Sequence, residues 1–118
     1  MKSVEWLKEQ GIDVDESLEL LGDMDMFNET LEDFITELEE RLPKLESYRN
    51  DLENYAILVH AMKSDAKYLG LTTLAELSYQ QELESKAGNH SFIQEHYDEL
   101  LQEVNRIQNI AQMYFGNA

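Results

Sequence analysis

Residues 27–45 read FNETLEDFITELEERLPKL, and apolar side chains recur there at every third or fourth position. This period places them along one face of an α-helix, with the acidic residues between them facing solvent. The apolar stripe consists of Phe27, Leu31, Phe34, Ile35, Leu38, Leu42 and Leu45. Pro43 lies inside the stripe and predicts a kink or a restart of the helix, because proline has no N–H for the carbonyl four residues earlier. Such a helix has to bury its apolar face, so the segment predicts a helical bundle.

Three further segments show the same period, at about residues 52–69, 71–87 and from residue 91 onward. Their stripes are Tyr55, Val59, Met62, Ala66 and Leu69, then Leu74, Leu77, Ser78 and Gln81, and finally Ile93, Tyr97, Leu100, Val104, Ile107, Ala111 and Tyr114. The connections at 50–54 and 87–91 are short, and short connections make consecutive helices antiparallel. The fold class is therefore expected to be all-α, an antiparallel four-helix bundle.

Two short helices, at about residues 4–10 and 16–21, are expected to form an N-terminal helical extension to this bundle. Glycines follow the ends of both, as is typical of helix C-termini. Asp13 or Asp15 can cap the second short helix, Asp23 or Asp25 the long helix after it, and Ser91 the last helix. No linker or repeat divides the chain, so residues 1–118 are expected to form one domain.

The composition restricts the classes of function. The 118 residues include 25 acidic and 9 basic residues, a net charge of −16. This charge argues against nucleic-acid binding and against an anionic membrane surface. There is no Cys, and no apolar run approaches the ~20 residues of a membrane span. Leu, Ile, Val and Phe number 31, enough for a folded core. A monomer in the cytoplasm is the expectation.

The sequence lacks the motifs that several kinds of functional site require. No glycine-rich nucleotide loop is present, and neither Glu-x-x-His nor His-Glu-x-x-His occurs, so no metal site is expected. His90 is expected on a surface loop, and His96 is expected to have a structural role. His60 differs, because Lys63 and Lys67 follow it by one and two helical turns on the same face.

Small residues share this face of the helix, namely Ala56 and Ser64. A neutral histidine beside two ammonium groups is typical of an anion site that contains a nucleophile, since the lysines offset the charge of an incoming phosphoryl group. The alternative is a solvated helix face that carries one histidine and two lysines without further function.

The segment 60–70, HAMKSDAKYLG, is similar to the signature of histidine-containing phosphotransfer (HPt) domains. That signature has Lys three residues after the His, a small residue next and Gly ten residues after the His. The segments 11–15 and 20–23, followed by Leu31 and Phe34, resemble the opening of the family. The likeness extends over about residues 11–116.

The resemblance implies roles for individual residues. His60 matches the phospho-accepting histidine, Lys63 the lysine that stabilises phosphate charge, and Ser64 a small position that is usually Gly. Glu82 stands where the family has Glu or Gln near the imidazole, and its carboxylate could accept the Nδ1–H and leave Nε2 as the nucleophile. The docking surface is expected to comprise Ala56, Ser64, Lys67 and Gly70.

The resemblance also implies a phosphocarrier without kinase activity or a bound cofactor, the Mg²⁺ of the reaction residing on the partner. The expected partners are receiver domains of response regulators, with a hybrid histidine kinase as a further candidate. His60 would accept a phosphoryl group from one receiver aspartate and pass it to another. Two alternatives stay open: a non-catalytic acidic adaptor that binds receivers, and the phospho-accepting substrate domain of a dedicated histidine kinase.

Overall fold

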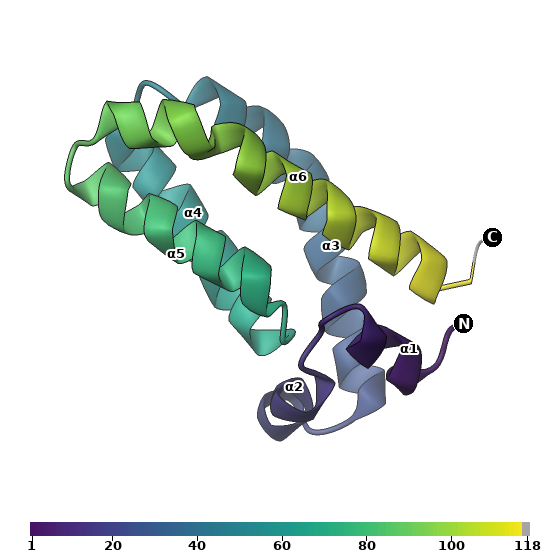
Figure 1. Ribbon diagram of the computed structural model, residues 1–118. Helices are drawn as coiled ribbons and strands as arrows, with labels where there is room; N and C mark the ends of the chain where they lie inside the picture. The colour runs from purple at the N-terminus through teal and green to yellow at the C-terminus, as the bar shows by residue number, and fades with distance from the viewer. Residues whose placement is uncertain (117–118) are drawn as a thin grey trace.

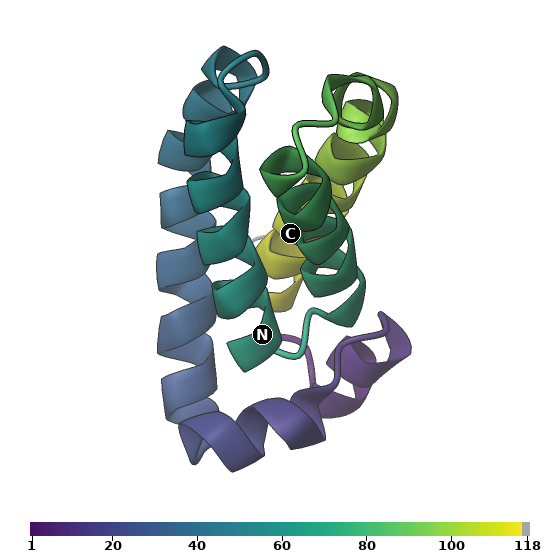
Figure 2. The ribbon, with the colours of Figure 1, turned by 90° about the vertical axis from the view of Figure 1, so that its left-hand side faces the viewer.

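The computed structural model describes residues 1–116, and the regular elements of this range are six helices. They are α1 (Val4–Glu9), α2 (Val14–Leu21), α3 (Met24–Ser47), α4 (Leu52–Tyr68), α5 (Thr72–Lys86) and α6 (His90–Tyr114). Helices α3 to α6 form the bundle (Figure 1), and α4 and α5 are its most closely packed pair. The α3–α4 and α5–α6 connections lie at one end and α1 and α2 at the other (Figure 2). The predicted four-helix bundle with a short N-terminal extension is confirmed.

Polar side chains mark most helix starts. Asp13, Asp23 and Asp51 each accept the N–H of the residue three positions later, as N-caps do. The prediction that Ser91 caps the last helix is wrong. Asn89 caps α6 by accepting the N–H of Phe92 at 3.2 Å, which is an equally favourable side chain two residues earlier. His90 is consequently the first residue of α6 rather than part of a loop, and it is exposed as expected.

Helix α3 continues through Pro43 to Ser47, so it does not restart there. Proline removes the hydrogen bond to the carbonyl of Glu39, but both residues are exposed. Water can therefore satisfy that carbonyl, and burial of the stripe on either side outweighs the lost bond.

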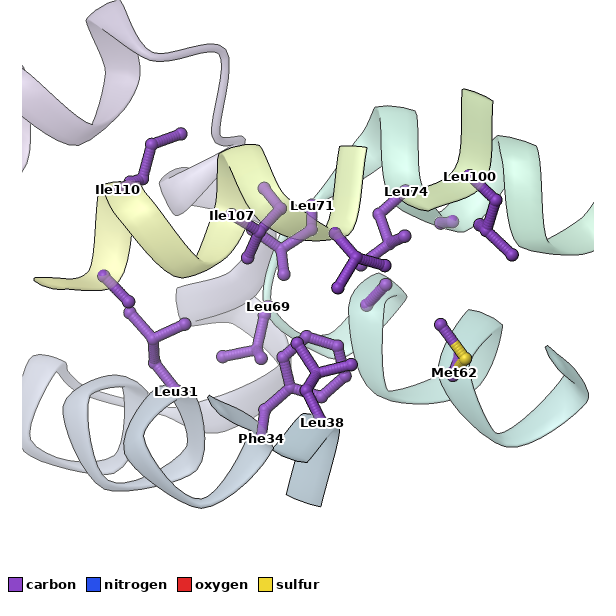
Figure 3. Close-up of a cluster of buried hydrophobic side chains, with 14 of the residues drawn as sticks. Leu31, Phe34, Leu38, Met62, Leu69, Leu71, Leu74, Leu100, Ile107 and Ile110 are labelled. Atoms are coloured by element: carbon purple, nitrogen blue, oxygen red, sulfur yellow. The ribbon is translucent and has the colours of Figure 1, made fainter. Parts of the chain in front are cut away.

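The core lies between the four bundle helices (Figure 3), and the buried side chains of Leu7, Ile12 and Val14 extend it to the N-terminal extension. Side chains of all four helices meet in it: Leu31, Phe34 and Leu38 from α3, Met62 from α4, Leu74 from α5, and Leu100, Ile107 and Ile110 from α6. All seven stripe positions predicted for the last helix are buried, whereas Ile35 and Leu42 of α3 are half-buried. The helical period thus identifies the core almost completely.

Hydrogen bonds attach the N-terminal extension to the bundle. The hydroxyl of Ser17 donates to the carbonyl of Tyr68 at 2.6 Å, and the guanidinium of Arg106 donates to the carbonyl of Gln10 at 2.9 Å. Helices α1 and α2 therefore close the end of the bundle at which α4 turns into α5. None of the helices within residues 1–116 is both long and apolar enough to cross a membrane.

Candidate functional site

The pairing of α4 with α5 brings His60 and Glu82 together. His60 lies in the middle of α4, and its side chain is 56% exposed. Glu82 lies on the facing side of α5, and its side chain is only 3% exposed. Nδ1 of His60 is 2.7 Å from Oε2 of Glu82. One polar group of the pair is thus open to solvent and the other is buried beneath it.

Two lysines complete the surroundings of Glu82. Nζ of Lys63 donates to Oε1 at 2.7 Å, and Nζ of Lys86 donates to Oε2 at 2.8 Å. Burial of Glu82 opposes its ionisation, but the hydrogen bonds from Lys63, Lys86 and His60 outweigh burial and lower the pKa of the carboxyl to about 2. Glu82 is therefore a carboxylate at neutral pH.

The ionised carboxylate determines which nitrogen of His60 carries the proton. A carboxylate only accepts hydrogen bonds, so Nδ1 has to be the donor in the contact with Glu82. In the neutral imidazole the lone pair then belongs to Nε2, on the other side of the ring from Glu82. The site therefore presents an oriented nucleophilic nitrogen on a half-exposed ring.

An open groove runs beside His60 between α4 and α5. It is lined by Leu52, Glu53, Ala56, Ile57, His60, Glu82, Ser85 and Lys86. The small side chains of Ala56 and Ser85 leave the ring accessible from this side, and Ile57 adds exposed apolar surface. Ala56 lines this groove but is itself buried, and its part in docking stays a prediction. Residues 1–116 contain no group of three or more His, Asp or Glu side chains that could hold a metal ion.

A second groove lies on the far side of Lys63. Its lining includes Lys63, Lys67, Gly70, Ala75 and Tyr79. Lys63 is only 18% exposed, and its ammonium group lies 5.1 Å from the centre of the Tyr79 ring. Lys67 is exposed but belongs to this groove rather than to the one that contains His60. Lys63 shares the carboxylate of Glu82 with His60, whereas Lys67 forms no hydrogen bond or ion pair with either residue, so a part of Lys67 in the site stays a prediction.

Gly70, expected on the docking surface, instead has a structural role. It is buried at a φ of +69°, and its carbonyl accepts the N–H of Asp13 at 2.9 Å. A Cβ at this position would lie 2.2 Å from the carbonyl oxygen of Asp13, so only glycine fits. Ser64 is half-buried on α4, one turn after His60, and lines neither groove.

Two features of the site were not predicted from the sequence: the ion pair of Lys86 with Glu82, and the hydrogen bonds of Gln81, which was expected only as part of the buried stripe of its helix. Lys86 was not singled out, although its place four residues after Glu82 is the spacing of a helical ion pair. Gln81 is buried between three helices: it accepts a hydrogen bond from the hydroxyl of Tyr55 and donates to the carbonyl of His96 at 2.9 Å. Gln81 thereby ties the turn of α5 that carries Glu82 to α4 and α6.

Comparison with protein families extends this description. Residues 24–110 match the family model of the Hpt domain, which covers α4, α5 and all four side chains of the site. No curated protein and no solved structure matches the chain. Hpt domains are phosphocarriers rather than kinases, and they transfer phosphoryl groups on histidine in two-component signalling. The match covers well over half of the chain, and the chain therefore belongs to the Hpt domain family.

Proposed function

We propose that this chain is a phosphorelay intermediate. His60 takes a phosphoryl group from the phospho-aspartate of one receiver domain and gives it to the aspartate of another. The observation that carries this proposal is the contact between the Nδ1–H of His60 and the buried, ionised Glu82, with the ring half-exposed. This arrangement supports attack by Nε2.

The transfer step needs no base, because no proton has to leave the ring. The lone pair of Nε2 forms a bond to phosphorus as the P–O bond to the receiver aspartate breaks, and the aspartate departs as a carboxylate. The ring keeps its Nδ1–H and becomes a phosphorylated imidazolium. Its positive charge faces the carboxylate of Glu82, which stabilises the adduct and holds the ring in orientation. Transfer to the next receiver follows the same path in reverse.

The surroundings of His60 support docking of a protein partner. Lys63 and Lys86 place positive charge next to the ring on an acidic protein, and this charge offsets that of the transferring phosphoryl group. Large apolar side chains are exposed nearby on both helices, with Ile57 on α4, and Tyr79 and Leu83 on either side of Glu82 in the α5 sequence. Exposed apolar surface around a functional group is typical of a protein-binding face. The receiver would supply the Mg²⁺ and most of the catalytic groups.

The test is a phosphotransfer profile with purified, radiolabelled phospho-receivers. Wild type is expected to acquire a label that is stable to alkali and labile to acid, as expected of phosphohistidine. His60→Gln should lose the label and keep its helical circular dichroism. His96→Gln is the matched control, because Nδ1 of His96 also lies near a carboxylate, that of Glu99 at 3.4 Å, but without lysines. Loss of label in His96→Gln, or its persistence in His60→Gln, would contradict the assignment.

The same assay separates the two alternatives. An adaptor would bind a receiver in wild type and in His60→Ala alike, with no label transferred to either. A kinase substrate domain would be labelled by a histidine kinase and ATP with no receiver present. Retention of His60 with its oriented ring favours the relay over the adaptor.

A further inference from the structure

We propose that Lys86 is the residue that contacts the phosphoryl group on His60, whereas Lys63 stays on Glu82 throughout the reaction. This inference rests on the proposed function. Both lysines bind Glu82, but they differ in exposure, in their position around the ring and in how freely they can leave the carboxylate.

The two lysines lie on different sides of the site. Lys86 lines the groove that contains His60, together with Ala56 and Ser85. Lys63 lines the other groove, with Tyr79 over its ammonium group. The side chain of Lys86 is 62% exposed and that of Lys63 is 18% exposed. A phosphoryl group that reaches the ring through the first groove therefore meets Lys86.

The lysines also differ in what their departure would leave behind. Among residues 1–116, Lys63 is the only donor to Oε1 of Glu82, so its departure would leave a buried carboxylate oxygen without a partner. Lys86 shares Oε2 with the Nδ1–H of His60, so this oxygen keeps a hydrogen bond when Lys86 leaves. Removing the sole partner of a buried charge is far more costly than removing one of two. Lys86 is thus the cation that can change partners.

Phosphorylation supplies the reason for the change. The phosphoryl group on Nε2 carries two negative charges. The imidazolium ring that bears it is positively charged, so it can replace the charge of Lys86 beside the carboxylate of Glu82. The ammonium group of Lys86 then moves from Oε2 of Glu82 to a phosphoryl oxygen, exchanging one charge-assisted hydrogen bond for another. No covalent bond changes in this movement. Lys86 stabilises both the phosphorylated protein and the transfer that leads to it.

Phosphoramidate allows a test without any receiver. The lone pair of Nε2 attacks phosphorus, the P–N bond of the donor breaks and ammonia leaves. The products are followed by ³¹P NMR over a pH series in wild type, Lys86→Ala and Lys86→Arg. Lys44→Ala is the matched control, since Lys44 is exposed on α3 and its loss changes the net charge equally. Unfolding temperatures are measured for all four proteins.

Contact with Lys86 favours the dianionic phosphoryl group. The midpoint of the ³¹P titration in Lys86→Ala is therefore expected about one pH unit above that of wild type. The rate of labelling should fall about tenfold, the usual effect of one charge-assisted hydrogen bond. Lys86→Arg should restore both values, and Lys44→Ala should leave both unchanged. The unfolding temperature of Lys86→Ala should stay near that of wild type.

Two results would overturn the inference in distinguishable ways. Normal labelling of wild type with an unchanged titration in Lys86→Ala would overturn the role of Lys86 and leave the proposed function intact. Absence of any label on His60 in wild type, from phosphoramidate and from phospho-receivers alike, would overturn both.

Discussion

Glu82 is the residue on which the other polar side chains of the site converge. It is one of 25 acidic residues, yet it is almost fully buried and binds three nitrogen donors. Burial of a carboxylate is costly unless its lone pairs accept hydrogen bonds, and His60, Lys63 and Lys86 supply these bonds. Glu82 therefore orients the ring of His60 and stabilises the pairing of α4 with α5.

This dual role predicts a pH dependence of stability. The pKa of Glu82 is lowered from 4.5 to about 2 in the folded protein. Its ionisation therefore stabilises the fold above about pH 4.5, and this contribution is lost as the pH falls toward 2. Glu82→Gln should lower the free energy of unfolding at pH 7 by about 3 kcal/mol, and the difference from wild type should shrink between pH 4.5 and pH 2.

Urea unfolding at several pH values measures this difference. Glu99→Gln serves as the control, since Glu99 is an exposed carboxylate near His96, and its removal should change stability little at any pH. Curves for wild type and Glu82→Gln that stay parallel from pH 7 to pH 2 would refute the coupling between Glu82 and the fold.

At the level of helices, the turn between α4 and α5 fixes how the N-terminal extension is attached. The chain passes through Gly70 at positive φ, and the backbone of Asp13 occupies the space that a Cβ at this position would need. Asp13 also caps α2 with its side chain. One backbone contact thus joins the start of α2 to the end of α4.

Two glycines allow this contact to be measured. Gly70 and Gly88 both have positive φ, but a Cβ on Gly88 would meet nothing within 4 Å. Gly88→Ala should therefore cost about 1 kcal/mol from backbone strain alone. Gly70→Ala should cost at least about 2 kcal/mol more, because Asp13 has to move. Equal losses in urea unfolding would show that the close approach to Asp13 contributes nothing.

Features that depend on neighbours within one helix were predictable from the sequence, whereas contacts between helices were not. Period and capping residues predicted the helices because both depend on neighbours within one or two turns. Position 60 and its lysine at 63 followed from the same local spacing. The hydrogen bonds of Gln81 were not predictable, because its partners Tyr55 and His96 lie on other helices.

The role of Lys86 shows a different limit. Its spacing from Glu82 is visible in the sequence, but exposed pairs of this kind are common and stabilise little. Only the burial of Glu82, which depends on packing against α4, makes this pair part of the site. The structural role of Gly70 was not predictable either, because its contact with Asp13 joins residues that lie far apart in the chain.

Over the whole molecule, charge is distributed unevenly. The net charge is −16, yet two of the nine lysines and arginines converge on Glu82. Most other acidic residues lie on exposed helix faces, where they repel one another across solvent. The pair of lysines beside His60 is thus a local exception on an acidic surface, at the place where the proposed transfer would bring an anionic phosphoryl group.

The two ends of the described chain lie together at the end of the bundle beside α1 (Figure 1). The N–H of Lys2 donates to the carbonyl of Tyr114 at 2.8 Å, and a Cβ added at Gly116 would lie 2.7 Å from the backbone nitrogen of Met1. A short glycine-serine linker can therefore join them and allow circular permutation.

A permutant opened between Ala87 and Gly88, in the exposed connection before α6, should unfold cooperatively and still be labelled on His60. A permutant opened inside α4, between Lys63 and Ser64, should do neither. These results would show that labelling of His60 depends on the packing of the four helices and not on their order along the chain.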